Sequence, residues 1–300
     1  MGAVAVPEQA RGQGVIDGWI NMPAFTRGEI VSDPALMKHL SFFGHGPEAF
    51  MEHSLKQLLG DMDAAQVGRG VLTGTPMGRN GSGMWGAASI DAAQAVEYCR
   101  ASGGRLRLGL QLDGLDRLTR VTRQLRDLAA AGDLALVRVI PSALEVPIDS
   151  RLLYHVYGTC EEIGVPVSVN VGIFGPLKSS KYQDPLLLED VLIDFPDLTV
   201  IGAHMGHPWE RLLIRLMMKH ENLHLMTSAF SPKYIVPEVV SFMNSSRGWH
   251  KVTWASEWPL LPFPKMLGEA RQLPLSGESQ DAYLGGNLAR ILDWPLAAAS

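Results

Sequence analysis

Short β-rich runs alternate with longer amphipathic runs along the whole chain, and this alternation is what most constrains its fold. It is typical of a parallel sheet covered by helices. The predicted strands cover residues 15–21, 69–75, 106–112, 134–140, 167–173, 199–204, 223–227 and 251–255. The predicted helices cover residues 33–43, 47–66, 89–102, 116–131, 149–163, 185–194, 208–220, 237–244 and 280–292.

Eight strand–helix units close a barrel more naturally than they form an open sheet. A length of 300 residues is ordinary for one α/β barrel, and no linker or low-complexity tract divides the chain. We therefore predict an α/β fold, a (β/α)₈ TIM barrel in a single domain over residues 15–300. Residues 1–14 are predicted to be a flexible lead. The glycine-rich segment 77–86 has no phosphate-binding pattern and is predicted to be a lid over the barrel mouth.

The composition argues against several classes of function. Lys and Arg number 26 and Asp and Glu number 31, so the net charge of −5 gives no reason to expect nucleic acid or an anionic membrane as partner. Cys99 and Cys160, the two cysteines, have no CxxC spacing that would suggest a zinc site. No apolar run reaches the roughly 18 residues that span a membrane. Residues 1–14 lack a signal-peptide pattern, and we expect a cytoplasmic protein.

Catalytic groups in such a barrel lie at the C-terminal ends of the strands. A catalytic zinc usually takes three His or carboxylate ligands plus water. His204 and Glu257 alone do not complete such a site, unless Asp113 or His207 contributes. The residues predicted at the strand ends are Trp19, Asn21, Thr73, Thr75, Gln111, Asp113, Arg138, Ile140, Asn170, His204, Thr227, Ser228 and Glu257.

Four segments carry a resemblance to a known family. They are VIDGWINMP at 15–23, IGAHMGHPW at 201–209, KVTWASEWP at 251–259 and YLGGNLARIL at 283–292. They resemble the amidohydrolase-related family, to which aminocarboxymuconate-semialdehyde decarboxylase belongs. The match extends over essentially the whole chain and is more specific in its second half. The resemblance implies an amidohydrolase-like barrel with hydrolase or decarboxylase chemistry.

The resemblance also implies a reduced metal site. The family's opening strand reads Asp-x-His-x-His, and Trp19 and Asn21 stand at its two metal-binding histidines. Asn170 stands at the histidine of the fifth strand, His204 keeps that of the sixth, and Glu257 replaces the aspartate of the eighth. An indole has no lone pair to give, and an amide oxygen is a weak zinc ligand. The implied cofactor is at most a single divalent metal, held by His204 and Glu257.

Two functional hypotheses follow. The first is a companion subunit, structural or regulatory, whose related and metal-competent amidohydrolase-fold partner subunit carries the chemistry. In this respect the chain resembles the smaller subunit of the two-subunit 2-aminoisobutyrate hydroxylase, a monooxygenase. The second is a metal-independent or weak-metal hydrolase or decarboxylase that acts on a small carboxylate substrate. We keep both, and the assignment as an enzyme stays open here.

In the second hypothesis His204 and Glu257 act as acid and base, and Asn21, Asn170 and Arg138 bind the substrate, with Trp19 counted among the substrate-binding residues. Trp19 fills the space that the metal and its water would take, and its N–H then needs an acceptor. Each residue also has a structural alternative. His204 could keep only a structural hydrogen bond, and Glu257 could be a buried carboxylate paired with a base such as Arg138.

Overall fold

The computed structural model describes residues 14–23, 25–75, 90–115, 117–173, 175 and 178–294. The predicted lid at 77–86 and all of the predicted lead except Gly14 lie outside the described residues. Across the described ranges, no helix has the length and apolar character needed to cross a membrane.

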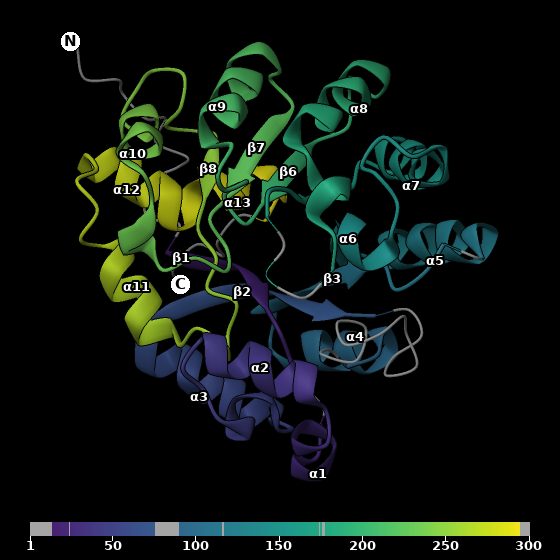
Figure 1. The fold of residues 1–300 in the computed structure, drawn as a ribbon, viewed down its shortest axis with the longest axis vertical. Coiled ribbons are helices and arrows are strands. Elements are labelled where there is room, and N and C mark those ends of the chain that lie inside the picture. Colours follow the sequence, from purple (N-terminus) through teal and green to yellow (C-terminus); the bar gives the residue numbers. More distant parts are fainter. Residues whose placement is uncertain are drawn as a thin grey trace.

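Eight parallel strands form one sheet in the order of the chain, which confirms the predicted TIM barrel (Figure 1). Each strand pairs in parallel with the next one along the sequence. The strands are β1 (Val15–Ile20), β2 (Val67–Gly74), β3 (Leu106–Gln111), β4 (Leu134–Val139), β5 (Val167–Asn170), β6 (Val200–Ala203), β7 (Leu223–Met226) and β8 (Val252–Thr253).

Helices surround the strands on the outside (Figure 1). The α-helices are α1 (Arg27–Val31), α2 (Pro34–Phe42), α3 (Leu55–Ala65), α4 (Ala92–Ala101), α5 (Leu118–Ala130), α6 (Pro141–Leu144), α7 (Arg151–Glu162), α8 (Leu188–Asp194), α9 (Glu210–Lys219), α10 (Pro237–Met243), α11 (Phe263–Ala270), α12 (Gly277–Asp281) and α13 (Asn287–Ile291). Short 3₁₀ helices are η2 (Pro47–Phe50), η4 (Ser180–Gln183), η5 (Pro185–Leu187) and η6 (Pro232–Tyr234), and η7 (Ala282–Gly286) is a π-helix.

Two predicted helices are divided in the structure. The segment 47–66 begins as η2 and restarts as α3, because Ser54 and Gln57 form a reciprocal capping box that starts a new helix. The segment 280–292 passes from α12 through η7 to α13. At Gly285 an added Cβ would lie 2.0 Å from the carbonyl oxygen of Gly14, so the last helical segment packs directly on the start of β1.

The barrel closes through the loop that follows β8 rather than through a long ladder. Gly18 N donates to Trp254 O at 3.2 Å, and Asn21 N donates to Trp258 O at 2.8 Å. In the other direction, Glu257 N donates to the carbonyl oxygen of Trp19 at 3.0 Å. These bonds hold the loop that carries Glu257 against the end of β1.

The N-terminal end of the barrel is covered by Trp294, which follows α13. Trp294 is buried there and belongs to the cluster of apolar side chains inside the barrel. The guanidinium carbons of Arg69 and Arg107, from β2 and β3, lie 5.3 and 4.9 Å from its ring centroid. Arg69 Nη1 also donates to the carbonyl oxygen of Trp294 at 2.7 Å. With this end covered, the opposite end is the one at which a site can open.

Candidate functional site

The predicted site residues gather at the C-terminal ends of the strands, opposite the end that Trp294 covers. Trp19 is in β1, Arg138 in β4 and Asn170 at the end of β5. His204 directly follows β6, and Glu257 lies in the loop after β8. Asn170 pairs in register with Ala203, the residue before His204, so the ends of β5 and β6 lie side by side. The Oδ1 atom of Asn170 is buried and has no hydrogen-bond partner among the described residues.

His204 and Glu257 face each other. His204 Nδ1 lies 3.7 Å from Glu257 Oε1, and the two side chains are 16% and 8% exposed. Ser228 holds the imidazole: its Oγ accepts from the backbone N–H of His204 at 3.3 Å and lies 2.9 Å from Nδ1. The hydroxyl proton of Ser228 can then be donated to Nδ1, which places the proton of neutral His204 on Nε2.

Both members of this pair have a backbone conformation that is uncommon for side chains other than glycine. The φ angle is +67° at His204 and +73° at Glu257, in the left-handed region. The two residues that follow His204, Met205 and Gly206, also have positive φ, at 59° and 67°. Such a conformation costs on the order of 1–3 kcal/mol at a non-glycine residue and clusters at active sites. The pair is therefore a candidate for function on backbone grounds as well as side-chain grounds.

A chain of hydrogen bonds leads from Trp19 to Glu257. Trp19 Nε1 donates to Asn21 Oδ1 at 3.0 Å, which supplies the acceptor that a buried indole needs. Asn21 Nδ2 in turn donates to Glu257 Oε2 at 3.4 Å. The indole ring centroid lies 4.9 Å from that of His204. Trp19 and Asn21 thus orient the pair from the side of β1.

Arg138 lies deeper in the barrel than this pair. It is fully buried, and its guanidinium carbon lies 3.9 Å from the ring centroid of Trp19. Nη2 donates to Gly18 O at 2.8 Å and to Val71 O at 3.3 Å. The Nε and Nη1 atoms have no hydrogen-bond partner among the described residues. Because the Trp19 ring covers one face of the guanidinium, a substrate could contact Arg138 only at the edge of that ring, through Nε or Nη1.

Sequence reasoning gave no role to Asp17, which is fully buried beneath the site. Asp17 Oδ1 accepts from Trp19 N at 2.8 Å and from Ser256 N at 3.0 Å. The other carboxylate oxygen accepts from the Ser256 hydroxyl. The carboxylate therefore ties β1 to the loop of Glu257. Its position two residues before Trp19, on the same face of a strand, is the signal that could have identified it.

Burial separates the pKa values of the site residues. It raises the pKa of Glu257 to about 7, although Arg138 and the Asn21 hydrogen bond oppose the rise. Burial likewise raises the pKa of Asp17 to about 6. It lowers the pKa of His204 to about 4 and that of Arg138 to about 9. Near neutral pH the guanidinium of Arg138 is therefore charged and the imidazole of His204 is neutral. Glu257 is present partly in its protonated form and partly as the carboxylate.

The residues present do not fit the metal site that the family resemblance implies. Within the described ranges, no group of three or more His, Cys, Asp or Glu side chains could hold a metal ion. His207 pairs with another carboxylate, since its Nδ1 lies 2.6 Å from Glu210 Oε1, and within the described ranges it completes no group of three with His204 and Glu257. The Arg138 cation lies against Trp19, one of the four replaced ligand positions, and would repel a second cation. His204 and Glu257 form a pair rather than a ligand set.

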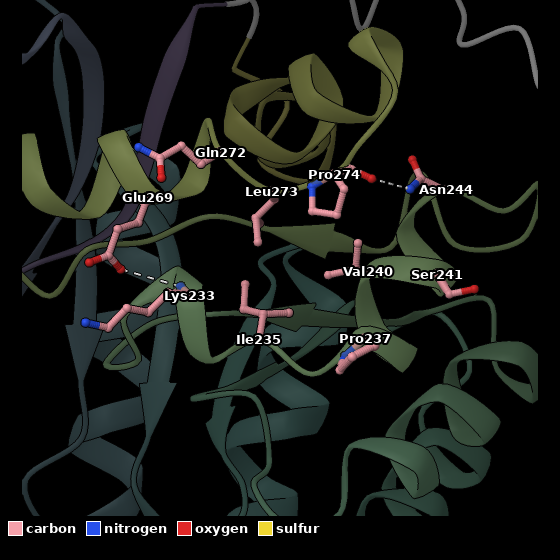
Figure 2. A pocket seen from close by; sticks show the side chains of 10 residues that line it. All are labelled: Lys233, Ile235, Pro237, Val240, Ser241, Asn244, Glu269, Gln272, Leu273 and Pro274. Atoms are coloured by element: carbon pink, nitrogen blue, oxygen red, sulfur yellow. Dashed lines mark hydrogen bonds between the residues drawn. The ribbon is translucent and has the colours of Figure 1, made fainter.

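A groove of about 520 Å³ lies on the outside of the barrel, between η6, α10 and α11 (Figure 2). Its middle is apolar, with Ile235, Val240 and Leu273, and Lys233 and Glu269 stand at one end. It contains none of the predicted site residues. The chemistry therefore places the candidate site at the strand ends rather than in this groove.

Comparison with known proteins agrees with the fold. The sequence model described as amidohydrolase matches residues 39–294. An uncharacterized TIM-barrel protein from Bordetella bronchiseptica has a TM-score of 0.76 and 23% identity, with 93% of this chain and 98% of that chain covered. A search of curated protein sequences finds no match.

Two decarboxylases also share the fold. For 5-carboxyvanillate decarboxylase from Sphingomonas paucimobilis the TM-score is 0.66 and the identity 14%, with 94% of this chain and 99% of that chain covered. The 5-carboxyvanillate decarboxylase from Novosphingobium aromaticivorans, in complex with manganese and a nitrobenzoic acid, has a TM-score of 0.67 and 13% identity. In that comparison 95% of this chain and 97% of the other are covered.

Proposed function

Because this chain belongs to the amidohydrolase family, we propose that it is an enzyme that acts on a small carboxylate substrate, a decarboxylase in the first place, with no tightly bound metal. The observation that carries the proposal is the His204–Glu257 pair. Its two side chains face each other at 3.7 Å, and both residues have left-handed backbones. Backbone strain costs stability and is usually found at active sites. Its presence at two polar residues that face each other therefore favours a catalytic pair over two independent structural contacts.

The pKa values suggest the division of roles. Burial raises the pKa of Glu257 to about 7, so near neutral pH this residue can serve as a general acid and recover its proton. Burial lowers the pKa of His204 to about 4, so its neutral imidazole can donate a hydrogen bond from Nε2 to a substrate oxygen. Pairs of groups whose pKa values are driven apart are the usual pattern of acid–base assignment in active sites.

In the proposed reaction the bond between the substrate carbon and its carboxylate breaks, and CO₂ leaves. The electron pair stays on the carbon, so the substrate must stabilise it by an adjacent carbonyl group or an electron-poor ring. Glu257 then donates its proton to that carbon and takes a proton back from water. The buried amide oxygen of Asn170, which has no partner among the described residues, is available to accept a hydrogen bond from the substrate, and Asn21 holds Glu257 in place.

Two features support a decarboxylase over other activities of the family. The named neighbours that share the fold include two decarboxylases of aromatic carboxylates. The described residues provide a buried proton donor, Glu257, but no ligand set for a metal-activated water. Proton donation to carbon needs only the donor, whereas hydrolysis at neutral pH needs an activated water.

The test is CO₂ release from a panel of small β-keto and aromatic carboxylates, with and without a chelator. We expect turnover that chelation leaves unchanged and that His204→Ala and Glu257→Gln each reduce at least 100-fold. The matched controls are His155→Ala and Glu221→Gln, which change the same residue types at exposed positions. Turnover that needs an added divalent ion, or that survives Glu257→Gln, would contradict the proposal.

The companion-subunit hypothesis stays a prediction, and the same preparation tests it. Expression with and without neighbouring genes, followed by size-exclusion chromatography, shows whether a related metal-containing chain co-purifies. Activity that appears only in such a complex, and that persists when His204 and Glu257 of this chain are replaced, would favour the companion role.

A further inference from the structure

We infer that the buried guanidinium of Arg138 is a resident cation that serves the carboxylates of the site in the place that a metal ion has in related proteins. The inference does not depend on the proposed reaction. It rests on how the barrel makes room for this group, how the group is held, and which charges surround it.

The barrel makes room for the guanidinium at Gly109, in β3. A Cβ atom at this position would lie 2.9 Å from Arg138 Nε and 3.0 Å from Arg138 Nη2. It would also lie 2.9 Å from the Cγ1 atom of Val71. Contacts below 3.0 Å are essentially never seen for real Cβ atoms. A side chain at position 109 of β3 would therefore overlap the guanidinium that extends from β4. Glycine at this position leaves the space that the guanidinium occupies.

The guanidinium is held by groups that favour a positive charge. Nη2 donates to the carbonyl oxygens of Gly18 and Val71, on β1 and β2, so the side chain extends from β4 across the inside of the barrel. The indole of Trp19 stacks on it at 3.9 Å, a cation–π contact in a buried environment. Carbonyl oxygens and a ring face act together here as the ligands of a fixed cation.

The charges around Arg138 are those that a metal ion would neutralise. Asp17 and Glu257 are the two carboxylates that interact electrostatically with it, and neither forms a close ion pair with it. Two buried carboxylates without a cation would repel each other and remain uncharged. Arg138 supplies the compensating charge from a position that is covalently fixed, so the site does not need to recruit an ion from solution.

The first test is the energetic coupling between Arg138 and Gly109. Gly109→Ala in the wild-type chain should lower the midpoint of thermal unfolding, because the new Cβ meets the guanidinium. In an Arg138→Ala background the same change should lower the midpoint by clearly less. Gly68→Ala, in the neighbouring strand β2, is the matched control, since an added Cβ there would lie 3.5 Å from Val15 O, an ordinary contact. Equal effects of Gly109→Ala in both backgrounds would overturn the inferred packing.

The second test separates charge from volume. Arg138→Lys keeps a cation and Arg138→Met keeps length without charge, so the Lys variant should unfold at a higher temperature than the Met variant. Guanidinium ion at concentrations far below denaturing ones should raise the midpoint of Arg138→Ala, saturably and by roughly 2–4 °C or more, and should not raise that of the wild type.

Elemental analysis of the wild-type protein completes the experiment. We expect no stoichiometric divalent metal, and no change in the unfolding midpoint on addition of manganese or zinc ions. A Lys variant that is no more stable than the Met variant would overturn the role of the charge, even where the Ala variant fails to fold. A tightly bound divalent ion in the wild type would overturn the inference as a whole. None of these measurements uses a substrate, so their outcome is independent of the proposed reaction.

Discussion

Glu257 Oε1 lies 3.7 Å from His204 Nδ1, close enough for the two groups to sense each other's charge and too far for a direct hydrogen bond. The imidazole is held instead by Ser228, and the carboxylate by Asn21. Each member of the pair is therefore oriented by a different partner. This arrangement leads to predictions that need no knowledge of the substrate.

The first prediction concerns the pH dependence of stability at Glu257. Burial raises the pKa of this residue from 4.5 to about 7, so between these values the folded state binds the proton that the unfolded state has lost. The free energy of unfolding of the wild type should therefore fall, relative to Glu257→Gln, as the pH rises through that window. The full difference is about 3 kcal/mol at pH 8 compared with pH 4. Urea unfolding of both proteins at several pH values measures it.

A flat profile would contradict this prediction. If the stability difference between wild type and Glu257→Gln is the same at pH 4 and at pH 8, the carboxylate of Glu257 is solvated in the folded protein.

The second prediction has the opposite sign and concerns His204. Burial lowers the pKa of its imidazole from 6.5 to about 4, so between these values the unfolded state binds a proton that the folded state does not. The wild type should therefore lose stability relative to His204→Gln as the pH falls from 7 to 4, by about 3 kcal/mol. The histidine C2-proton resonance followed by NMR gives the pKa directly. A midpoint near 6.5 would refute the prediction.

The third prediction concerns the left-handed backbone at Glu257. Glycine in an exposed helix interior is about 1 kcal/mol less stable than alanine, but at a positive φ the order reverses. Glu257→Gly should therefore be more stable than Glu257→Ala, by about 1 kcal/mol. Glu97, exposed in α4, is the control position, where the Ala variant should be the more stable one. Chemical unfolding of the four variants checks both signs.

Much of the barrel could be predicted from the sequence, because each strand and helix is a local pattern of apolar residues. The strand order follows from the alternation, and the strand ends then indicate where Trp19, Asn21, Arg138, His204 and Glu257 gather. The break before α3 also had a local signal, the Ser54 and Gln57 capping box, which the helix prediction for 47–66 overlooked.

The internal arrangement of the site could not be predicted in the same way. The stacking of Arg138 under Trp19 depends on room left by Gly109, and these three residues lie on β4, β1 and β3. No local pattern indicates such a contact, because it is fixed only when the barrel closes. The Glu257 N–H donates to Trp19 O, and this contact between β1 and the loop after β8 likewise forms only when the barrel closes.

The last prediction separates the two contributions of Trp19. Trp19→Phe keeps a ring over Arg138 but removes the donor to Asn21, so it should cost about 1 kcal/mol of stability. Trp19→Ala removes the ring as well and leaves the guanidinium uncovered, so it should cost about 3–5 kcal/mol. Chemical unfolding at pH 7 compares the two variants. If Trp19→Phe is as damaging as Trp19→Ala, the hydrogen bond to Asn21, rather than the ring face on Arg138, is the main contribution of this side chain.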